Sequence, residues 1–224
     1  MSLHIVIGTK TYSSWSLRGW LAVAHTGLPF RETKLALDTE EFYREIEAFS
    51  PTKCVPALQD GDIQVWDSLA IIDYCAHLTP EKNWWPTDKA AYARARSICA
   101  EMHSGFMALR GAAPMNFRGS WKDLILSEAV QKDVNRIDQI WQECREGFGQ
   151  AGAFLFGEFG AADMMYAPVA SRFRTYGIQL SPISQAYVDS ILNHPLLLRW
   201  QEDAATETQI VAQDEIPADA TQLG

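Results

Sequence analysis

Over the first 80 residues, short apolar runs alternate with segments of helical periodicity. Residues 3–7 read Leu-His-Ile-Val-Ile, which predicts a buried strand. Residues 15–26 place apolar side chains at positions i, i+3, i+4 and i+7, the spacing of an amphipathic helix. Gly27 and Pro29 end that helix, because glycine favours a helix C-terminus and proline cannot continue a helix. This region therefore begins with a strand and a helix.

The rest of this region predicts a strand, a helix, a hairpin and a final helix. Asp60-Gly61 lies between two alternating segments and is a two-residue turn signal typical of a β-hairpin. Asp67 and Ser68 precede the last, apolar helix. The predicted order over the whole region is β-α-β-α-β-β-α. The segments after the first helix are, in order, 31–37, 40–49, 56–59, 62–66 and 69–78.

The pattern becomes helical after Thr79. Long helices are predicted over 90–109, 122–148 and 161–176, with shorter ones after Pro182 and Pro195. The last residues carry acidic side chains and no basic ones, so we expect them to be loosely attached. We thus expect an α/β N-terminal domain over 1–79, a linker over 80–88, an all-α domain over 89–206 and an acidic tail over 207–224.

Composition narrows the class of protein. The 224 residues are 47% hydrophobic and 21% charged, as in an ordinary globular protein. The net charge of −9 argues against nucleic acid as a partner, because its phosphates require a basic surface. No apolar run approaches the roughly 20 residues that span a bilayer. The chain begins with the first predicted strand, so we expect no signal peptide. We expect a soluble cytoplasmic protein.

The cysteines and histidines point away from disulfides and metals. The four cysteines stand far apart, with no paired spacing, and the five histidines are isolated. This pattern suits a reducing compartment and fits neither a disulfide framework nor a zinc site. We therefore expect no bound metal.

Ser13 and Ser14 stand between the first strand and the first helix. One of them can simply cap the helix. The free N–H groups and the dipole at a helix N-terminus also favour an anion there. A serine cannot act as a base, but it can donate a hydrogen bond to a bound thiolate. The two roles do not compete, since one serine can cap while the other donates.

Two further features lie where chain reversals would bring them towards these serines. Val55-Pro56 stands before the hairpin; if this bond is cis, the Val55 backbone can pair with an extended peptide, whereas a trans proline here is only an edge residue. Lys53 can meet a carboxylate or remain solvated. Asp67 and Ser68 can cap the next helix, or can hold an amino-acid head group through its ammonium and carboxylate. Together the three features match the three parts of glutathione.

The chain resembles a cytosolic glutathione transferase, of the serine type and zeta-like, from Leu3 to about Thr206. The resemblance is carried by Ser-Ser-Trp-Ser-Leu-Arg over 13–18, by the segment 50–58 around Val55-Pro56, and by the segment 67–74. It implies a thioredoxin-like N-terminal domain followed by a helical domain. It also implies that Ser13 or Ser14 activates the thiol, that Pro56 is cis, that Val55 pairs with the cysteinyl backbone, and that Asp67 with Ser68 binds the γ-glutamyl group.

The implied activity is attack of the glutathione thiolate on a small, hydrophobic electrophile, with glutathione as co-substrate. The alternatives are a non-catalytic binding or regulatory relative and a glutathione-dependent isomerase of the maleylacetoacetate type. Zeta-type isomerases carry an arginine in the third long helix, but neither Arg172 nor Arg174 falls at the expected spacing. Arginines near a helix end usually face solvent. The resemblance also implies a homodimer and, among the activities of such enzymes, detoxification.

The second-substrate pocket is expected between the first domain and the long helices. His103 is a candidate acid or base, although a single histidine on an amphipathic helix is more often structural. The motif 157–163 places Gly160 where family members have a capping serine or threonine, so we assign Asp163 a folding role. The expected lining residues are Trp15, Met102, His103, Phe106, Arg110 and Tyr166.

Overall fold

A computed structural model describes residues 3–217 and 219–224 of the chain. The chain forms two compact units. The first combines the chain up to Lys82 with Pro195–Gln213, and the second combines Asn83–His194 with Asp214–Gly224. Among the described residues, no helix is both long and apolar enough to cross a membrane.

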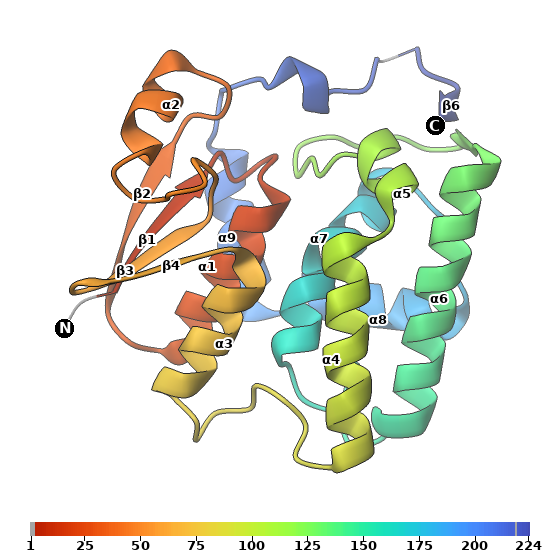
Figure 1. Cartoon of the computed structure of the whole chain (residues 1–224). Coiled ribbons are helices and arrows are strands. Elements are labelled where there is room, and N and C mark those ends of the chain that lie inside the picture. Colours follow the sequence, from red (N-terminus) through yellow and green to blue (C-terminus); the bar gives the residue numbers. More distant parts are fainter. Residues whose placement is uncertain (1–2, 218) are drawn as a thin grey trace. The chain divides into compact units, whose positions relative to one another are not determined.

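The first unit contains a four-stranded mixed sheet (Figure 1). Its strand order is β2-β1-β3-β4, with β1 parallel to β2 and antiparallel to β3. The two-residue turn between β3 and β4 consists of Gly61 and Asp62, one position later than predicted, because Gly61 takes the positive φ of 60° that the turn needs. The strands are β1 (Leu3–Gly8), β2 (Phe30–Leu35), β3 (Ala57–Asp60) and β4 (Ile63–Trp66).

Helices α1 (Ser14–Thr26) and α3 (Ser68–Leu78) lie side by side against this sheet (Figure 1). Helix α2 (Glu40–Ile46) packs through Phe42 and Ile46 into a buried cluster with Val6, Leu35 and Ala57. The order β-α-β-α-β-β-α is therefore confirmed, and it gives the thioredoxin-like arrangement.

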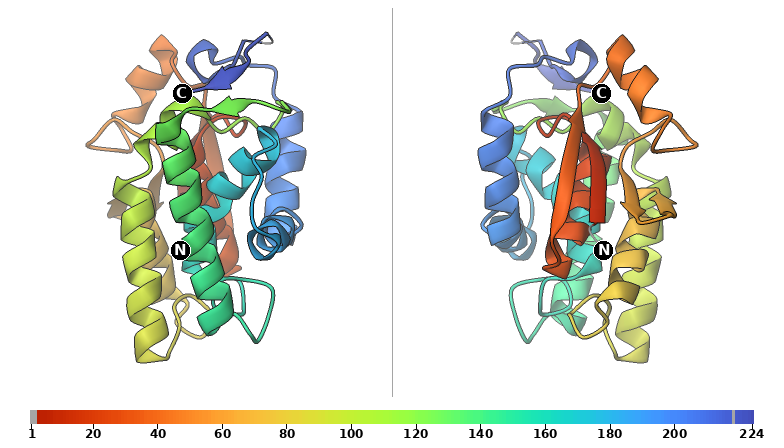
Figure 2. Two further views of the ribbon diagram at one scale, coloured as in Figure 1. Left: turned by 90° about the vertical axis from the view of Figure 1, so that its right-hand side faces the viewer. Right: turned by 90° about the vertical axis from the view of Figure 1, so that its left-hand side faces the viewer.

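The second unit is helical, as predicted (Figure 2). Its buried centre is the ring of Trp141, which contacts Tyr166, Phe173 and Tyr187 edge-on at centroid distances of 5.7, 5.3 and 4.8 Å. Such aromatic pairs add to the free energy of burying the rings. The helices are α4 (Lys89–Ser104), α5 (Met107–Ala112), α6 (Glu128–Phe148), α7 (Ala161–Thr175) and α8 (Pro182–Leu192).

Two of the predicted long helices differ by several residues from the observed ones. The helix predicted over 90–109 is interrupted after Ser104, because Gly105 is extended and Phe106 adopts a left-handed conformation with φ of 57°. The helix predicted over 122–148 starts at Glu128, where Ser127 caps it by accepting a hydrogen bond from the Val130 amide. The residues before it include β5 (Ile125–Leu126), which pairs with β6 (Gln222–Leu223).

The C-terminal part of the chain is divided differently from the predicted domains. Helix α9 (Pro195–Ala205), predicted as part of the helical domain, belongs to the first unit. There the Trp200 indole donates a hydrogen bond of 3.0 Å to the Lys10 carbonyl and its ring contacts Trp20. The predicted loose tail makes ordered contacts: Val211 and Leu223 are buried, and a 3₁₀ turn forms over Ala212–Asp214.

The Glu207 side chain hydrogen-bonds to the loop that leads into α1. Its buried carboxylate accepts hydrogen bonds from the amides of Lys10 and Thr11 at 2.9 and 2.8 Å, from the Thr11 hydroxyl at 2.9 Å and from the Lys34 ammonium at 2.8 Å. Burial alone would raise the pKa of Glu207, but the hydrogen bonds from Lys34, Lys10 and Thr11 outweigh it and hold the pKa below its usual value. Two main-chain donors before the first helix therefore depend on one distant side chain.

Replacing Glu207 by glutamine should lower the free energy of unfolding at pH 7 by about 1–3 kcal/mol, because buried donors lose a charged acceptor. A carboxylate with a depressed folded-state pKa stabilises fully above its unfolded pKa, and the stabilisation is lost as the pH falls through the folded value. The difference between the two proteins should therefore shrink below about pH 4. Urea unfolding measured across pH tests this. Glu202, which is exposed on α9, provides the control, and an equal effect of Glu202→Gln would contradict the role of Glu207.

Candidate functional site

The first unit contains a cavity of about 410 Å³. Its wall comes from three segments that are distant in the sequence: the first turn of α1, the loop before β3, and the junction of β4 with α3. The lining residues are Trp15, Thr52, Cys54, Val55, Pro56, Trp66, Asp67 and Ser68. The structure thus brings together five residues singled out from the sequence, namely Trp15, Val55, Pro56, Asp67 and Ser68.

Sequence reasoning missed three of the lining residues. Cys54 stands in the segment 50–58, and Trp66 ends the predicted hairpin, but neither pattern indicated which way the side chain points. Thr52 stands in the same segment, which likewise did not indicate the direction of its side chain. The predicted Lys53 is not among the lining residues; its ammonium pairs with Glu47 at 2.5 Å on the surface.

The structure separates the roles of Ser13 and Ser14. Ser13 is the N-cap of α1: its hydroxyl accepts from the Ser16 amide at 3.4 Å and donates to the Ser16 hydroxyl at 2.7 Å. Ser14 is the first residue of the helix and is half-buried, and its hydroxyl has no hydrogen-bond partner among the described residues. Ser14 is not itself a lining residue, but it directly precedes Trp15, which is. Of the two hydroxyls, that of Ser14 is therefore the one left unpaired among the described residues.

Positive charge lies beside this helix N-terminus. The buried guanidinium of Arg18 stacks over the ring of Trp15 at 4.4 Å from its centroid and donates to the Ser14 carbonyl at 3.4 Å. A cation next to the positive end of the helix dipole favours an anion at the same place.

The loop before β3 supplies main-chain groups. The Val55–Pro56 peptide bond is cis, as the resemblance implies. The main-chain N–H and C=O of Val55 make no hydrogen bond to any described residue. Buried or half-buried main-chain groups are almost always paired, so this residue has the donor and acceptor that one residue of an extended peptide would use.

The start of α3 supplies the last wall. Asp67 is the N-cap, with φ of 74°, and its carboxylate accepts from the amides of Leu69 and Ala70 at 2.9 and 3.4 Å. Asp67 therefore does cap the helix, whatever else it binds. Ser68 is only 1% exposed, and its Oγ has no hydrogen-bond partner among the described residues. An orphaned buried hydroxyl costs free energy unless a ligand or water pairs with it.

The remaining predicted residues belong to the second unit. Met102 and Tyr166 are fully buried, and the Tyr166 hydroxyl donates to the Ile98 carbonyl at 3.1 Å. Phe106 is buried at the start of α5, His103 is half-buried near the end of α4, and the Arg110 guanidinium donates to the Gly105 carbonyl at 3.3 Å. The assignment of these five residues to a second-substrate pocket remains a prediction.

Arg172 does not face solvent, contrary to the expectation for an arginine near a helix end. It is buried, and its Nε donates to the Ala113 carbonyl at 2.8 Å. Burial and then the nearby charge of Arg110 lower the pKa of Arg172 to about 10. Arg174, two residues later on the same helix, is exposed.

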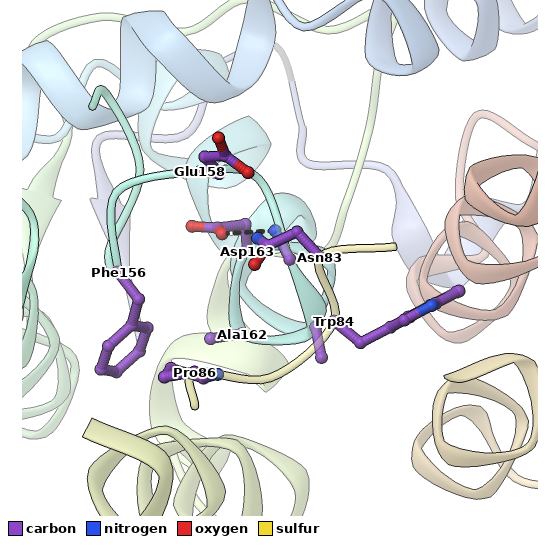
Figure 3. A pocket seen from close by; sticks show the side chains of 9 residues that line it. Asn83, Trp84, Pro86, Phe156, Glu158, Ala162 and Asp163 are labelled. Carbon is purple, nitrogen blue, oxygen red and sulfur yellow. Dashed lines mark hydrogen bonds between the residues drawn. The ribbon is translucent and has the colours of Figure 1, made fainter. Parts of the chain in front are cut away.

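Asp163 holds the start of α7 (Figure 3). Its carboxylate accepts from the amides of Gly160 and Leu155 at 2.9 and 3.2 Å and from the Tyr187 hydroxyl at 2.9 Å. Burial raises the pKa of Asp163 to about 6 despite these hydrogen bonds. The adjoining cavity, of about 20 Å³, has room for about one water molecule. This geometry supports a folding role for Asp163.

Family models cover much of the chain. The glutathione S-transferase N-terminal domain matches residues 12–78, and the glutathione S-transferase C-terminal domain matches residues 127–202. A zeta-class glutathione S-transferase of Euphorbia esula is 30% identical over 197 residues, which is 85% of this chain and 80% of the relative. A maleylacetoacetate isomerase of Rattus norvegicus is 26% identical over 178 residues, 77% of this chain and 79% of the relative.

Solved structures show the same fold. A glutathione transferase homolog from Burkholderia with bound glutathione has a TM-score of 0.71 at 20% identity, over 92% of this chain and all of the other (100%). A maleyl pyruvate isomerase, described as a bacterial glutathione S-transferase in the zeta class, has a TM-score of 0.69 at 19% identity, with the same coverage of 92% and 100%. At these identities the likeness shows the fold alone.

Gly19 lets the loop before β3 approach α1. A Cβ at Gly19 would lie 2.8 Å from Cγ of Pro56, inside the contact distance, and the proline ring cannot rotate away. Gly19→Ala should therefore destabilise the protein by about 1–3 kcal/mol, the usual cost of overpacking. Gly147→Ala in α6 is the control. A Cβ there meets nothing within 4 Å, so it should stabilise by about 0.5–1 kcal/mol. Thermal unfolding of both variants tests this, and shifts of the same sign would show that Gly19 is not a packing constraint.

Proposed function

The chain belongs to the glutathione S-transferase family, and on that premise we propose that it binds glutathione in the cavity of its first unit and activates the thiol. The thiolate then attacks a small, hydrophobic electrophile. The protein supplies position and electrostatic stabilisation, while glutathione supplies the nucleophile.

The observation that supports this proposal best is the set of unpaired polar groups at the cavity. Ser14 offers a hydroxyl, Val55 a main-chain donor and acceptor, and Ser68 a second hydroxyl. They come from three separate segments, yet each lies in the cavity wall or next to a residue of it. A tripeptide with a thiol in the middle and charged groups at its ends pairs with all three.

The groups at the start of α1 can supply the free energy needed to ionise the bound thiol. Lowering a thiol pKa from about 8.5 to about 6.5 requires roughly 2.7 kcal/mol. A charge-assisted hydrogen bond from Ser14 contributes roughly 1.5–3 kcal/mol, and the dipole of α1 adds roughly 0.3–1 kcal/mol. The Arg18 guanidinium adds positive charge at the same end of the helix. Ser13 instead keeps the helix start in place.

The head group of glutathione is assigned to the start of α3. Ser68 and the helix N-terminus suit its carboxylate, and the Asp67 carboxylate suits its ammonium. Pro56 and Val55 would hold the middle of the peptide. Lys53 is less well supported, because it pairs with Glu47.

A second candidate is a glutathione-dependent isomerase of the maleylacetoacetate type. It is favoured by the rat relative that carries this name, at 26% identity. Both reactions begin with the same thiolate, so the first unit serves either. A non-catalytic relative is disfavoured, because a binding scaffold has no need of a hydroxyl kept unpaired beside a helix N-terminus.

The setting of the reaction is also a proposal. The four cysteines are unpaired, which fits a reducing cytoplasm and a role in detoxification there. A homodimer is supported by the edge strand β4, where Ile63 is 50% and Trp66 43% exposed. Exposed apolar side chains on an edge strand are typical of a surface covered by a partner. Since Trp66 also lines the cavity, dimerisation and glutathione binding would be linked.

Ser14→Ala should cut kcat/KM by about 10- to 1000-fold, because it removes a donor to the developing thiolate. The pKa of the bound thiol, followed by thiolate absorbance, should rise in the same variant. Ser13→Ala should instead lower the stability by about 1 kcal/mol through loss of the cap, with a much smaller change in the thiol pKa. If Ser13→Ala raises the thiol pKa and Ser14→Ala leaves it unchanged, the two roles are reversed.

Asp67→Asn isolates the charge of Asp67 from its cap, since asparagine is an equally good N-cap and tolerates a positive φ. We expect the KM for glutathione to rise while kcat at saturation barely changes, because the contact is far from the sulfur. The stability of Asp67→Asn should stay within about 0.5 kcal/mol of the parent, whereas Asp67→Ala loses both functions. An unchanged KM in Asp67→Asn would leave Asp67 as a helix cap only.

A further inference from the structure

The thiol of Cys54 lies in the wall of the cavity. Cys54 is exposed, whereas Cys75, Cys99 and Cys144 are buried. Burial raises the pKa of Cys75 and of Cys144 to about 12, which keeps both as unreactive thiols. Thiol reagents in solution should therefore react with Cys54 in preference to the three buried cysteines.

A second observation shows that this cavity is built for a ligand. The Ser68 Oγ is buried and has no partner among the described residues, and it lies in the same wall as Cys54. Val55, the neighbour of Cys54 in the chain, has an unpaired main-chain donor and acceptor. A ligand that pairs with both groups would occupy the cavity that Cys54 lines. The Cys54 thiol donates a hydrogen bond to the Thr52 carbonyl at 3.3 Å.

The distances suit a disulfide. Residues paired across two extended chains have Cα atoms about 4.5–5.5 Å apart, and successive residues advance by about 3.4 Å. A peptide residue paired with Val55 therefore has its Cα about 6 Å from that of Cys54. Disulfides join Cα atoms about 4.4–6.8 Å apart, so this main-chain separation is compatible with one, and Cys54 lines the cavity that the ligand would occupy.

We propose that Cys54 is a thiol–disulfide exchange site for glutathione disulfide. The idea rests on the proposed function, because one glutathionyl half must occupy the cavity. The Cys54 thiolate, formed by loss of its proton to solvent, attacks the sulfur of the bound half. A new S–S bond forms between Cys54 and that half as the old S–S bond breaks, and the other half leaves as a thiolate that takes up a proton.

In this step Cys54 is oxidised and one glutathione is reduced, so no further oxidant is needed. The product carries a glutathionyl group covalently in the cavity and excludes free glutathione from it. Excess reduced glutathione reverses the exchange, because the same mixed disulfide is attacked from solution. The occupancy of the site then follows the ratio of oxidised to reduced glutathione.

The test uses the reduced full-length protein and glutathione disulfide, with intact-mass and peptide mass spectrometry as the readout. We expect one glutathionyl group per chain, on Cys54, with Cys75, Cys99 and Cys144 unmodified in the same sample. Cys54→Ser should gain none. S-methylglutathione, which cannot exchange, should slow the modification at least about 10-fold, and hydroxyethyl disulfide, which lacks the peptide arms, should react at least about 10-fold more slowly.

An absence of adduct, or an adduct rate that S-methylglutathione does not change, would overturn the proposal. Calorimetric titration of reduced glutathione into the reduced wild-type protein tests glutathione binding separately from disulfide exchange at Cys54. If glutathione binds but Cys54 gains no glutathionyl group, or gains one at a rate that S-methylglutathione does not change, the exchange site is wrong and the proposed function stands. If glutathione does not bind at all, both are wrong.

Discussion

The close approach of Pro56 to α1 at Gly19 is the contact on which the cavity depends. It places the loop before β3 against the helix that begins with Ser14, and only a residue without a side chain leaves room for the proline ring. The junction of β4 and α3 is tied to the same loop through the antiparallel pairing of β3 with β4. One tight packing contact and one ladder of hydrogen bonds thus set where three distant segments meet.

Around that meeting point, some polar groups hydrogen-bond within the protein, and others are left unpaired by the described residues. Ser13 and Asp67 cap α1 and α3, so both helix starts are held even without a ligand. Ser14, the Val55 backbone and Ser68 are left with donors or acceptors that no described residue uses. Because unpaired polar groups inside a protein are costly, their gathering at one cavity is more informative than any single motif. Cys54 becomes notable for the same reason, since it adds a reactive atom to that wall.

The C-terminal segment serves the site from the opposite end of the chain. Glu207 binds the amides of Lys10 and Thr11, and Lys10 in turn pairs with Glu32 and Asp203 at 2.9 and 2.6 Å. The loop before Ser13 is therefore held by side chains almost 200 residues away. The acidic C-terminal segment, whose composition predicts loose attachment, therefore helps to hold the loop before the first helix.

Local patterns determined the elements of this protein and the residue types at its site. Helical periodicity, the Asp-Gly turn and the Asp67-Ser68 helix start act over a few residues, so the order of strands and helices and the candidates Val55, Pro56, Asp67 and Ser68 could be read directly from the sequence. Which of Ser13 and Ser14 caps the first helix could not be read from it, because that depends on which hydroxyl reaches Ser16 once the backbone is folded. The burial of Arg172 and the place of α9 in the first unit were likewise decided by tertiary structure. They follow from contacts between distant residues, of Arg172 with the Ala113 carbonyl and of Trp200 with the Lys10 carbonyl, which leave no periodicity in the sequence.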